Sequence, residues 1–161
     1  MKYKEDLKIA ESKKKDFQSV LKKLRRTKPK DLDDHFHELH DQTFLDIDCL
    51  QCANCCSTTS PIFLQSDIER LSKLLKMKVP VFIQTYLKID DEGDYVLQES
   101  PCAFLGADNK CIVYESRPKA CREYPHTNRK RMYQITSLTY KNALMCPAVS
   151  RIMVEIHKIY T

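Results

Sequence analysis

The stretch Cys49-Leu-Gln-Cys52-Ala-Asn-Cys55-Cys56 is the most informative part of this chain, because it holds four of the eight cysteines within eight residues. A Cys-x-x-Cys step turns two sulfurs toward a common point, and several thiolates gathered there repel one another unless a cation neutralises them. The stretch therefore predicts a metal site. Adjacent cysteines do not easily aim at one point on a regular backbone, so Cys55 and Cys56 either serve different sites or one of them only packs.

The other four cysteines follow at wide spacings. A dispersed cysteine, taken singly, is more often a small buried hydrophobe than a ligand. Beside the clustered four, however, we predict that the dispersed cysteines are ligands too, because eight thiols divide naturally into two four-ligand sites. The predicted metal ligands are Cys49, Cys52, Cys55, Cys56, Cys102, Cys111, Cys121 and Cys146. The spacing leaves open whether there are one or two sites and which cysteines share each.

The order of these motifs resembles the CxxCxxCC, or YkgJ-like, cysteine-cluster family over about residues 48–147. The resemblance implies chelation of zinc or iron, and flagellin lysine N-methylases are among the longer proteins that carry the motif. Asn54 stands where the family often has glycine, and asparagine tolerates left-handed backbone better than most residues. The resemblance is carried by the Cys49–Cys56 stretch, Pro101-Cys102-Ala-Phe104-Leu105, Cys111-Ile-Val-Tyr114-Glu115-Ser-Arg117-Pro118-Lys-Ala-Cys121-Arg122-Glu-Tyr124-Pro125 and Cys146-Pro147.

Two metal centres, Zn²⁺ and a [4Fe-4S] cluster, remain open from the sequence. Zinc sites commonly use separated Cys-x-x-Cys pairs, whereas Cys49, Cys52 and Cys55 with a remote Cys146-Pro147 are similar to ferredoxin ligation. A bacterial ferredoxin run would place its fourth cysteine at Thr59, so that match is partial. Either centre leaves a net negative charge on its four thiolate ligands. We expect Arg117 and Arg122 to stabilise this charge by donating hydrogen bonds to the sulfurs.

Composition is that of a globular chain without a nucleotide-binding loop. The 161 residues are 42% hydrophobic and 30% charged, with only two glycines, which fits one domain with a core of its own. The amino-terminal residues lack an apolar run and no stretch reaches membrane-spanning length, so we expect a cytoplasmic protein that uses no membrane. In that reducing compartment the cysteines favour metal or redox chemistry over disulfides.

Charge is unevenly distributed along the chain. Residues 1–30 hold twelve Lys or Arg and four Asp or Glu, while residues 31–48 hold seven acidic groups and no basic one. Segments of opposite sign are expected to dock. A second basic group lies beside Cys121 and consists of Arg117, Lys119, Arg122, Arg129, Lys130 and Arg131. Both basic segments suit an anionic partner as well as water.

The pattern of apolar residues predicts a mainly helical α+β fold: a small single domain with terminal helices around an irregular, metal-stapled middle and a short β-hairpin. We expect an N-terminal helical arm over 1–47, a cysteine-cluster domain over 48–147 and a closing helix over 148–161. Within these segments we predict a first helix from Tyr3 that stops before Pro29 and a second helix capped by Asp31. A third helix is expected after a Ser66-x-x-Glu69 capping box, a fourth at Pro80 and a last one from Pro147. Strands are expected at 95–97 and 111–114, across a turn at 106–110.

Three functions are compatible with the sequence. The first is a metal-binding protein, zinc- or iron-chelating or iron-sulfur, with a structural or redox accessory role and a possible protein partner. The second is a metal-dependent protein-modifying enzyme such as a lysine N-methylase, although no glycine-rich cofactor loop or Ser/His/Asp arrangement is present. The third is a nucleic-acid-binding module that uses the two basic segments.

Overall fold

The computed structural model describes residues 3–58, 60–108 and 110–161; Thr59 of the ferredoxin comparison and Asn109 of the predicted 106–110 turn lie outside them. The described chain is mainly helical and carries a two-stranded antiparallel sheet, which confirms the α+β prediction. It forms two compact units, unit 1 (Met1–Cys52 with Pro125–Thr161) and unit 2 (Ala53–Tyr124). The division of the chain into 1–47, 48–147 and 148–161 stays a prediction. No helix among the described residues is long and apolar enough to cross a membrane.

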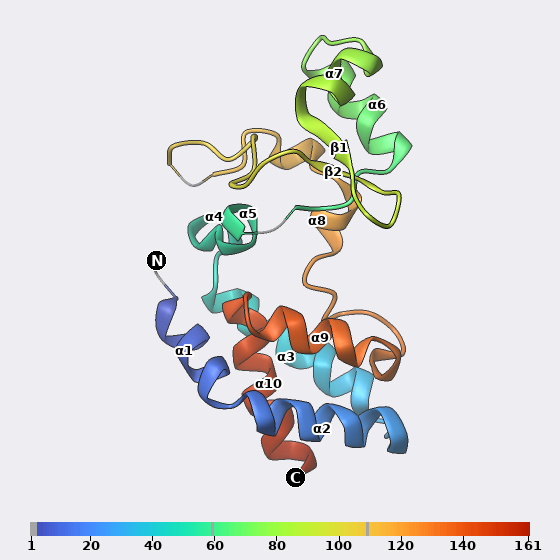
Figure 1. The fold of residues 1–161 in the computed structure, drawn as a ribbon. Helices are drawn as coiled ribbons and strands as arrows, with labels where there is room; N and C mark the ends of the chain where they lie inside the picture. The colour runs from blue at the N-terminus through green and yellow to red at the C-terminus, as the bar shows by residue number, and fades with distance from the viewer. Residues whose placement is uncertain (1–2, 59, 109) are drawn as a thin grey trace. The chain divides into compact units, whose positions relative to one another are not determined.

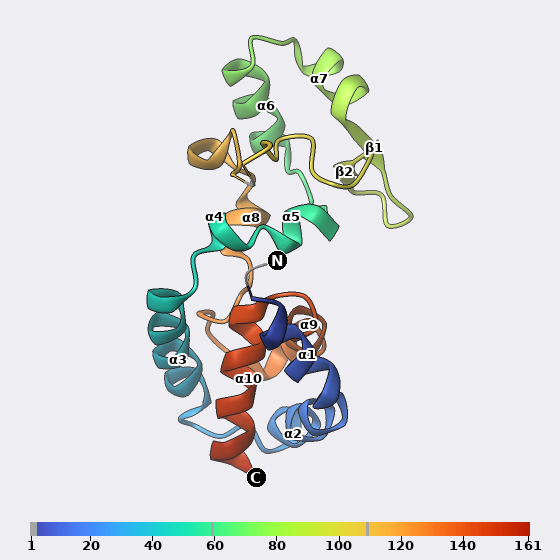
Figure 2. The same ribbon diagram turned by 90° about the vertical axis from the view of Figure 1, so that its left-hand side faces the viewer.

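Unit 1 is a bundle of helices around its last helix. In Figures 1 and 2 this helix, α10, runs through the middle of the unit, and it contacts α1, α2, α3 and α9. Pro147 stands at its first position, as predicted, where the missing N–H costs nothing. The elements of unit 1 are α1 (Lys4–Ser12), α2 (Lys14–Thr27), α3 (Leu32–Asp46), α4 (Cys49–Cys52), the 3₁₀ turn η2 (Met132–Ile135), α9 (Thr136–Ala143) and α10 (Pro147–Tyr160).

An apolar stripe predicted a single N-terminal helix, because apolar residues repeat every seven positions at Tyr3, Ala10, Phe17 and Leu24. This helix is broken in two at Lys13. The residue leaves helical geometry with φ −108° and ψ 14°, so α1 and α2 take different directions. Both halves still bury the stripe, with Ala10 in α1 and Phe17 and Leu24 in α2 almost inaccessible to water. The break lets each half reach the core of unit 1, and α2 then ends before Pro29 as expected.

Helix α3 begins where predicted, but Asp31 does not cap it through its side chain. The Asp31 carboxylate instead accepts a 2.8 Å hydrogen bond from the Tyr160 hydroxyl. The acidic segment does meet the second basic segment, although through backbone groups. The Asp33 carboxylate accepts hydrogen bonds from the N–H groups of Arg131 and Met132, at 2.7 and 2.9 Å.

Unit 2 contains the hairpin, which differs from the one expected. Strand β2 (Tyr95–Leu97) pairs with β1 (Leu87–Ile89) across a turn over residues 90–94, whereas 111–114 is not its partner. Cys111 forms only an isolated bridge with Leu105. The elements of unit 2 are α5 (Asn54–Thr58), α6 (Gln65–Leu74), α7 (Val79–Tyr86), β1, β2, the 3₁₀ turn η1 (Tyr114–Ser116) and α8 (Lys119–Glu123).

The core of unit 2 is an aromatic cluster centred on Phe82, which is fully buried and has its ring near those of Phe63, Tyr86 and Phe104. Phe82 comes from α7, whose first turn contains Pro80 as predicted. Phe104 belongs to the loop that carries Cys102 and Cys111. The cluster therefore fixes one end of that loop by burial of apolar area.

Candidate metal centre

Three cysteines of unit 2 lie in segments that backbone contacts hold together. The N–H of Cys102 donates a 2.8 Å hydrogen bond to the carbonyl of Cys56, which joins α5 to the loop after the hairpin. Ile112 then donates to the carbonyl of Phe104 at 2.8 Å, and the Leu105–Cys111 bridge closes a short loop between two cysteines. Cys56, Cys102 and Cys111 are thus drawn together from positions up to 55 apart in the numbering.

Cys121 joins these three from helix α8. Burial raises the pKa of the Cys121 thiol to about 12, and charge repulsion from Cys56, Cys102 and Cys111 adds to the effect. A thiolate feels such repulsion only from near neighbours, because charge interactions are screened over short distances in protein and water. Four thiols of unit 2, those of Cys56, Cys102, Cys111 and Cys121, therefore form one electrostatic group, which we call the Cys56 set.

Within the Cys56 set the thiols differ in their ease of ionisation. A hydrogen bond between the side chains of Cys55 and Cys56 lowers the pKa of Cys56 to about 7. Burial raises the pKa of Cys102, while the N–H of Phe104, 3.4 Å from its sulfur, opposes the rise. Cys56 is thus the thiol best prepared to bind a cation, and the other thiols have to release their protons to solvent when they bind it.

Arg117 supplies positive charge beside the set. Its charge lowers the pKa of Cys121, opposing the effect of burial. The guanidinium lies 4.0 Å from the centre of the Tyr114 ring and donates a 2.8 Å hydrogen bond to the Tyr114 carbonyl, so its position is fixed. Arg122, named with it from the sequence, is exposed on α8, and its role stays a prediction.

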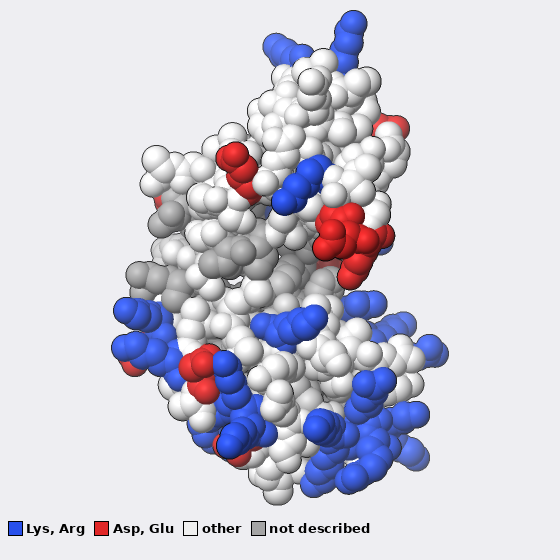
Figure 3. Space-filling model, viewed as in Figure 1, with Lys and Arg blue, Asp and Glu red and all other residues white. Residues whose placement is uncertain are grey.

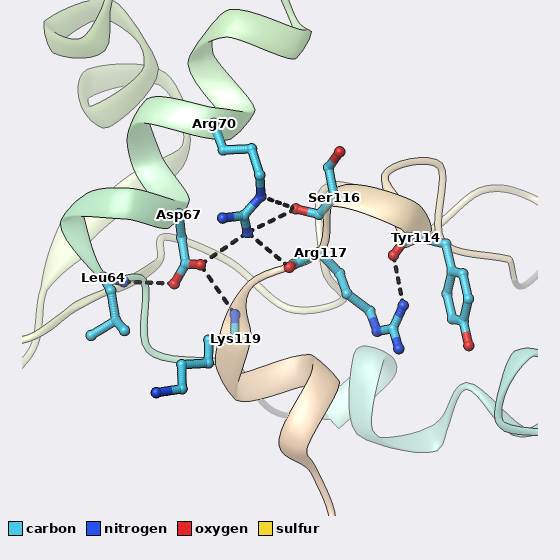
Figure 4. A network of polar contacts seen from close by, with 7 residues as sticks. All are labelled: Leu64, Asp67, Arg70, Tyr114, Ser116, Arg117 and Lys119. Atoms are coloured by element: carbon cyan, nitrogen blue, oxygen red, sulfur yellow. Dashed lines mark hydrogen bonds and ion pairs between the residues drawn. The ribbon is translucent and has the colours of Figure 1, made fainter.

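A buried carboxylate holds the segment that carries Arg117 and Cys121. Asp67 of α6 is fully buried, and it accepts hydrogen bonds from the N–H groups of Leu64 at 2.9 Å and Lys119 at 3.1 Å. Figure 4 shows these bonds together with Arg70, whose guanidinium pairs with Asp67 at 2.9 Å and reaches the carbonyls of Ser116 and Arg117. Two side chains of α6 thus fix the entry into α8.

The sequence prediction missed this network because it assigned the capping box to Ser66 and Glu69. Helix α6 instead begins at Gln65, and the carboxylate that bonds the N-cap residue Leu64 is Asp67. The only signal in the sequence was Asp67 three residues before Arg70, a spacing that places the two side chains on one face of a helix. Ion pairs on the protein surface share that spacing, so the spacing alone did not indicate that Asp67 is buried and holds another segment.

The remaining ligands predicted from the sequence include three cysteines of unit 1. Burial raises the pKa of Cys146 to about 12, and the charges of Cys52 and Cys49 raise it further. The N–H groups of Val149 and Ala148, at the start of α10, donate to the Cys146 sulfur and oppose the rise. Cys52 and Cys146 also pack against the same small apolar cluster. Cys55, which the ferredoxin comparison grouped with them, belongs to unit 2.

Over the described ranges 3–58, 60–108 and 110–161, no three His, Cys, Asp or Glu side chains stand in an arrangement that could hold a metal ion as they are. Among the histidines, His37 contacts the Arg129 carbonyl and His40 contacts the Thr127 hydroxyl, both at 2.7 Å. These two histidines therefore have different hydrogen-bond partners. The grouping of the cysteines rests on shared backbone contacts and mutual charge effects.

Fold and thiol groups together define a small cysteine-rich domain suited to chelating a metal. The comparison with protein families agrees, since residues 48–147 match the model of the CxxCxxCC family, described as "Putative zinc- or iron-chelating domain". The chain belongs to this family, and the description supports metal binding by this part of it.

A weaker relative is an uncharacterized protein, MJ0661, of Methanocaldococcus jannaschii. It is 28% identical over 95 residues, which are 57% of this chain and 50% of the relative. The chain thus matches about half the length of that protein. No solved structure matches the chain significantly.

Proposed function

We propose that the chain binds a metal centre in unit 2 through Cys56, Cys102, Cys111 and Cys121, and that this centre stabilises the irregular part of the unit. The observations that carry the proposal are the backbone contacts that join the segments of Cys56, Cys102 and Cys111, together with the effect of the charges of these three thiols on the pKa of Cys121. Four thiols from one neighbourhood are the donor set of structural zinc sites and of iron-sulfur clusters alike. Family membership supports the same two metals.

The donor chemistry of the set fits such a centre. Thiolates, not thiols, bind metal, so binding displaces protons from Cys102 and Cys121, whose pKa values burial raises. Bound metal supplies the positive charge that makes four neighbouring thiolates compatible. Arg117 then offsets part of the negative charge that a divalent ion leaves on four thiolates.

A structural role follows from how little regular structure surrounds these cysteines. Between Gln98 and Pro118 the described residues form no regular structure besides the turn η1 and the isolated Leu105–Cys111 bridge. Binding of structural zinc by thiolates contributes about 10–16 kcal/mol, as much as the whole stability of a small domain. We infer that the centre supplements the apolar core, to which this segment contributes only Phe104 and Val113 as buried hydrophobic side chains among its described residues.

Cys49, Cys52 and Cys146 are proposed as a second centre, in unit 1. The support is the effect of Cys52 and Cys49 on the pKa of Cys146 and the N–H groups of α10 that donate to its sulfur. Donors to sulfur stabilise bound thiolates. This set has three thiols, so its centre takes a further ligand.

Metal analysis of the chain purified without oxygen tests the proposal. We expect the protein to retain zinc or iron in stoichiometric amount, with sulfur-to-iron absorption in the visible range if the metal is a cluster and none if it is zinc. Cys146→Ser is expected to keep the centre of unit 2. A protein that is folded, reduced and free of both metals would refute the proposal.

Arg117 gives a prediction about affinity. Replacing it by glutamine removes the positive charge beside Cys121, and loss of such a supporting group lowers metal affinity about 10- to 100-fold. Competition with a coloured chelator measures the change. Arg117→Lys, which keeps the charge, is the matched control and is expected to retain most of the affinity; equal losses in both variants would mean that Arg117 acts through its contacts with Tyr114 alone.

A further inference from the structure

A group of basic side chains in unit 1 takes no part in the proposed metal centres. It consists of Arg25, Arg26 and Lys28 at the end of α2 and of Arg129 and Lys130 in the loop before η2, and we call it the basic corner. All five residues are exposed. Figure 3 shows Lys and Arg side chains gathered over this end of α2, with no Asp or Glu of the described residues among them in that view.

The two segments of the basic corner are held side by side by specific contacts. Helix α2 contacts η2, and the Lys28 ammonium lies 5.2 Å from the centre of the Tyr133 ring. Arg25 and Lys28 line a shallow depression of about 360 Å³ together with Tyr133 and Gln134. The corner therefore forms one surface, although its two segments are about 100 residues apart in the chain.

The loop of the basic corner is anchored from α3. His37 contacts the Arg129 carbonyl at 2.7 Å, and Asp33 accepts the N–H of Arg131 at 2.7 Å. Backbone atoms provide both contacts on the loop side. The side chains of Arg129 and Lys130 are thereby left to point into water from a fixed backbone.

Acidic neighbours do not neutralise this surface. Arg25, Arg26, Lys28, Arg129 and Lys130 form no ion pair with any residue that the structure describes. Two acidic groups at the start of α3 are engaged elsewhere, Asp33 with backbone N–H groups and the N-cap residue Asp31 with the Tyr160 hydroxyl.

The helix dipole explains only part of the pattern. Basic residues in the last turn of a helix are stabilised by its partial negative charge, which accounts for Arg25 and Arg26. Arg129 and Lys130 do not belong to α2. These two side chains add positive charge to the corner that the dipole of α2 does not explain.

We propose that the basic corner binds the phosphate backbone of a nucleic acid. Guanidinium groups pair with phosphate oxygens in a fixed, two-pronged geometry, and several cations on one rigid surface neutralise successive phosphates. A membrane surface suits the corner less well. A helix that lies on a bilayer inserts its apolar face, and Phe17, Val20 and Leu24 of α2 are buried in the protein core.

Fluorescence anisotropy with labelled oligouridylate, and separately with a labelled DNA duplex, tests the proposal on the full chain. We expect binding to at least one probe, with affinity that falls steeply as salt rises. The double substitution Arg129→Gln with Lys130→Gln removes two phosphate contacts. The plot of log affinity against log salt should therefore become less steep by about 1.5, and affinity at low salt should drop roughly tenfold or more.

The matched control is Lys4→Gln with Lys8→Gln, which removes two charges from α1 and is expected to bind like the wild type. Equal weakening in both variants would show that net charge alone attracts the probe and would overturn the assignment to this corner. So would the absence of binding to either nucleic acid, or binding to phosphatidylserine vesicles alone. Circular dichroism of each variant verifies that the helices remain folded.

Discussion

Replacing Cys121 by serine is expected to remove the metal centre of unit 2 and to unfold the cysteine-bearing part of that unit. One of four thiolates is lost, and a serine hydroxyl binds zinc or iron poorly at neutral pH. If the ligands share the roughly 10–16 kcal/mol of metal binding evenly, the loss is about 3 kcal/mol or more, a factor of a hundred or more in affinity. Competition with a chelator measures the affinity.

Hydrogen exchange of residues 53–124 reports the structural part of this prediction, because exchange separates the two units of one chain. We expect faster exchange in unit 2 and unchanged exchange in α2 and α10 of unit 1. Cys49→Ser serves as the control, since Cys49 lies in unit 1, in the other proposed centre, and its loss is expected to leave exchange in residues 53–124 unchanged. If Cys121→Ser kept the protection of residues 53–124, while Cys49→Ser lost it, the assignment of the Cys56 set would be wrong.

The sequence was sufficient for the helices whose signals are local. Pro147 and Pro80 mark helix starts by the geometry of their own rings, and both were placed correctly. The break at Lys13 was not predictable in this way, because the heptad stripe runs straight through it. Its cause is the fit of two helices onto α10, and that is a property of the packed unit.

The hairpin illustrates why strand pairing is harder to predict than helix formation. Leu87–Ile89 continues the apolar residues of α7, so nothing in the sequence separates β1 from that helix. Its strand geometry depends on pairing with Tyr95–Leu97, and the pairing of two short strands is decided by their surroundings. Cys111 was placed in a strand by its β-branched neighbours, yet its loop forms a single bridge.

For the candidate site, the sequence named the eight thiols but not their grouping. Cys55 and Cys56 are adjacent, and whether they share a centre depends on where Cys102, Cys111 and Cys121 lie in three dimensions. The contact between Cys102 and Cys56 joins segments 46 residues apart, which spacing alone does not reveal. The eight ligands remain a prediction, now divided between two units.

Asp67→Asn is expected to cost stability and metal affinity together. The substitution keeps the shape of the side chain but removes its charge, and the new amide N–H₂ faces N–H donors of Leu64 and Lys119. Breaking a buried ion pair on one side costs about 3–5 kcal/mol, and we expect the lower end because the Arg70 side chain is 34% exposed. Urea unfolding followed by circular dichroism measures the change.

The loss should extend to the metal centre because Asp67 and Arg70 hold the segment from Ser116 to Lys119, which contains Arg117 and leads to Cys121. A freed segment has to be ordered again each time the metal binds, so part of the binding free energy is consumed.

Glu123→Gln is the matched control on α8. Its pair with Lys119 is half-exposed at 3.7 Å and contributes no more than about 0.5 kcal/mol. If Asp67→Asn lowered stability without changing metal affinity, the Asp67–Arg70 pair would support the fold of α6 alone and would not position the ligands.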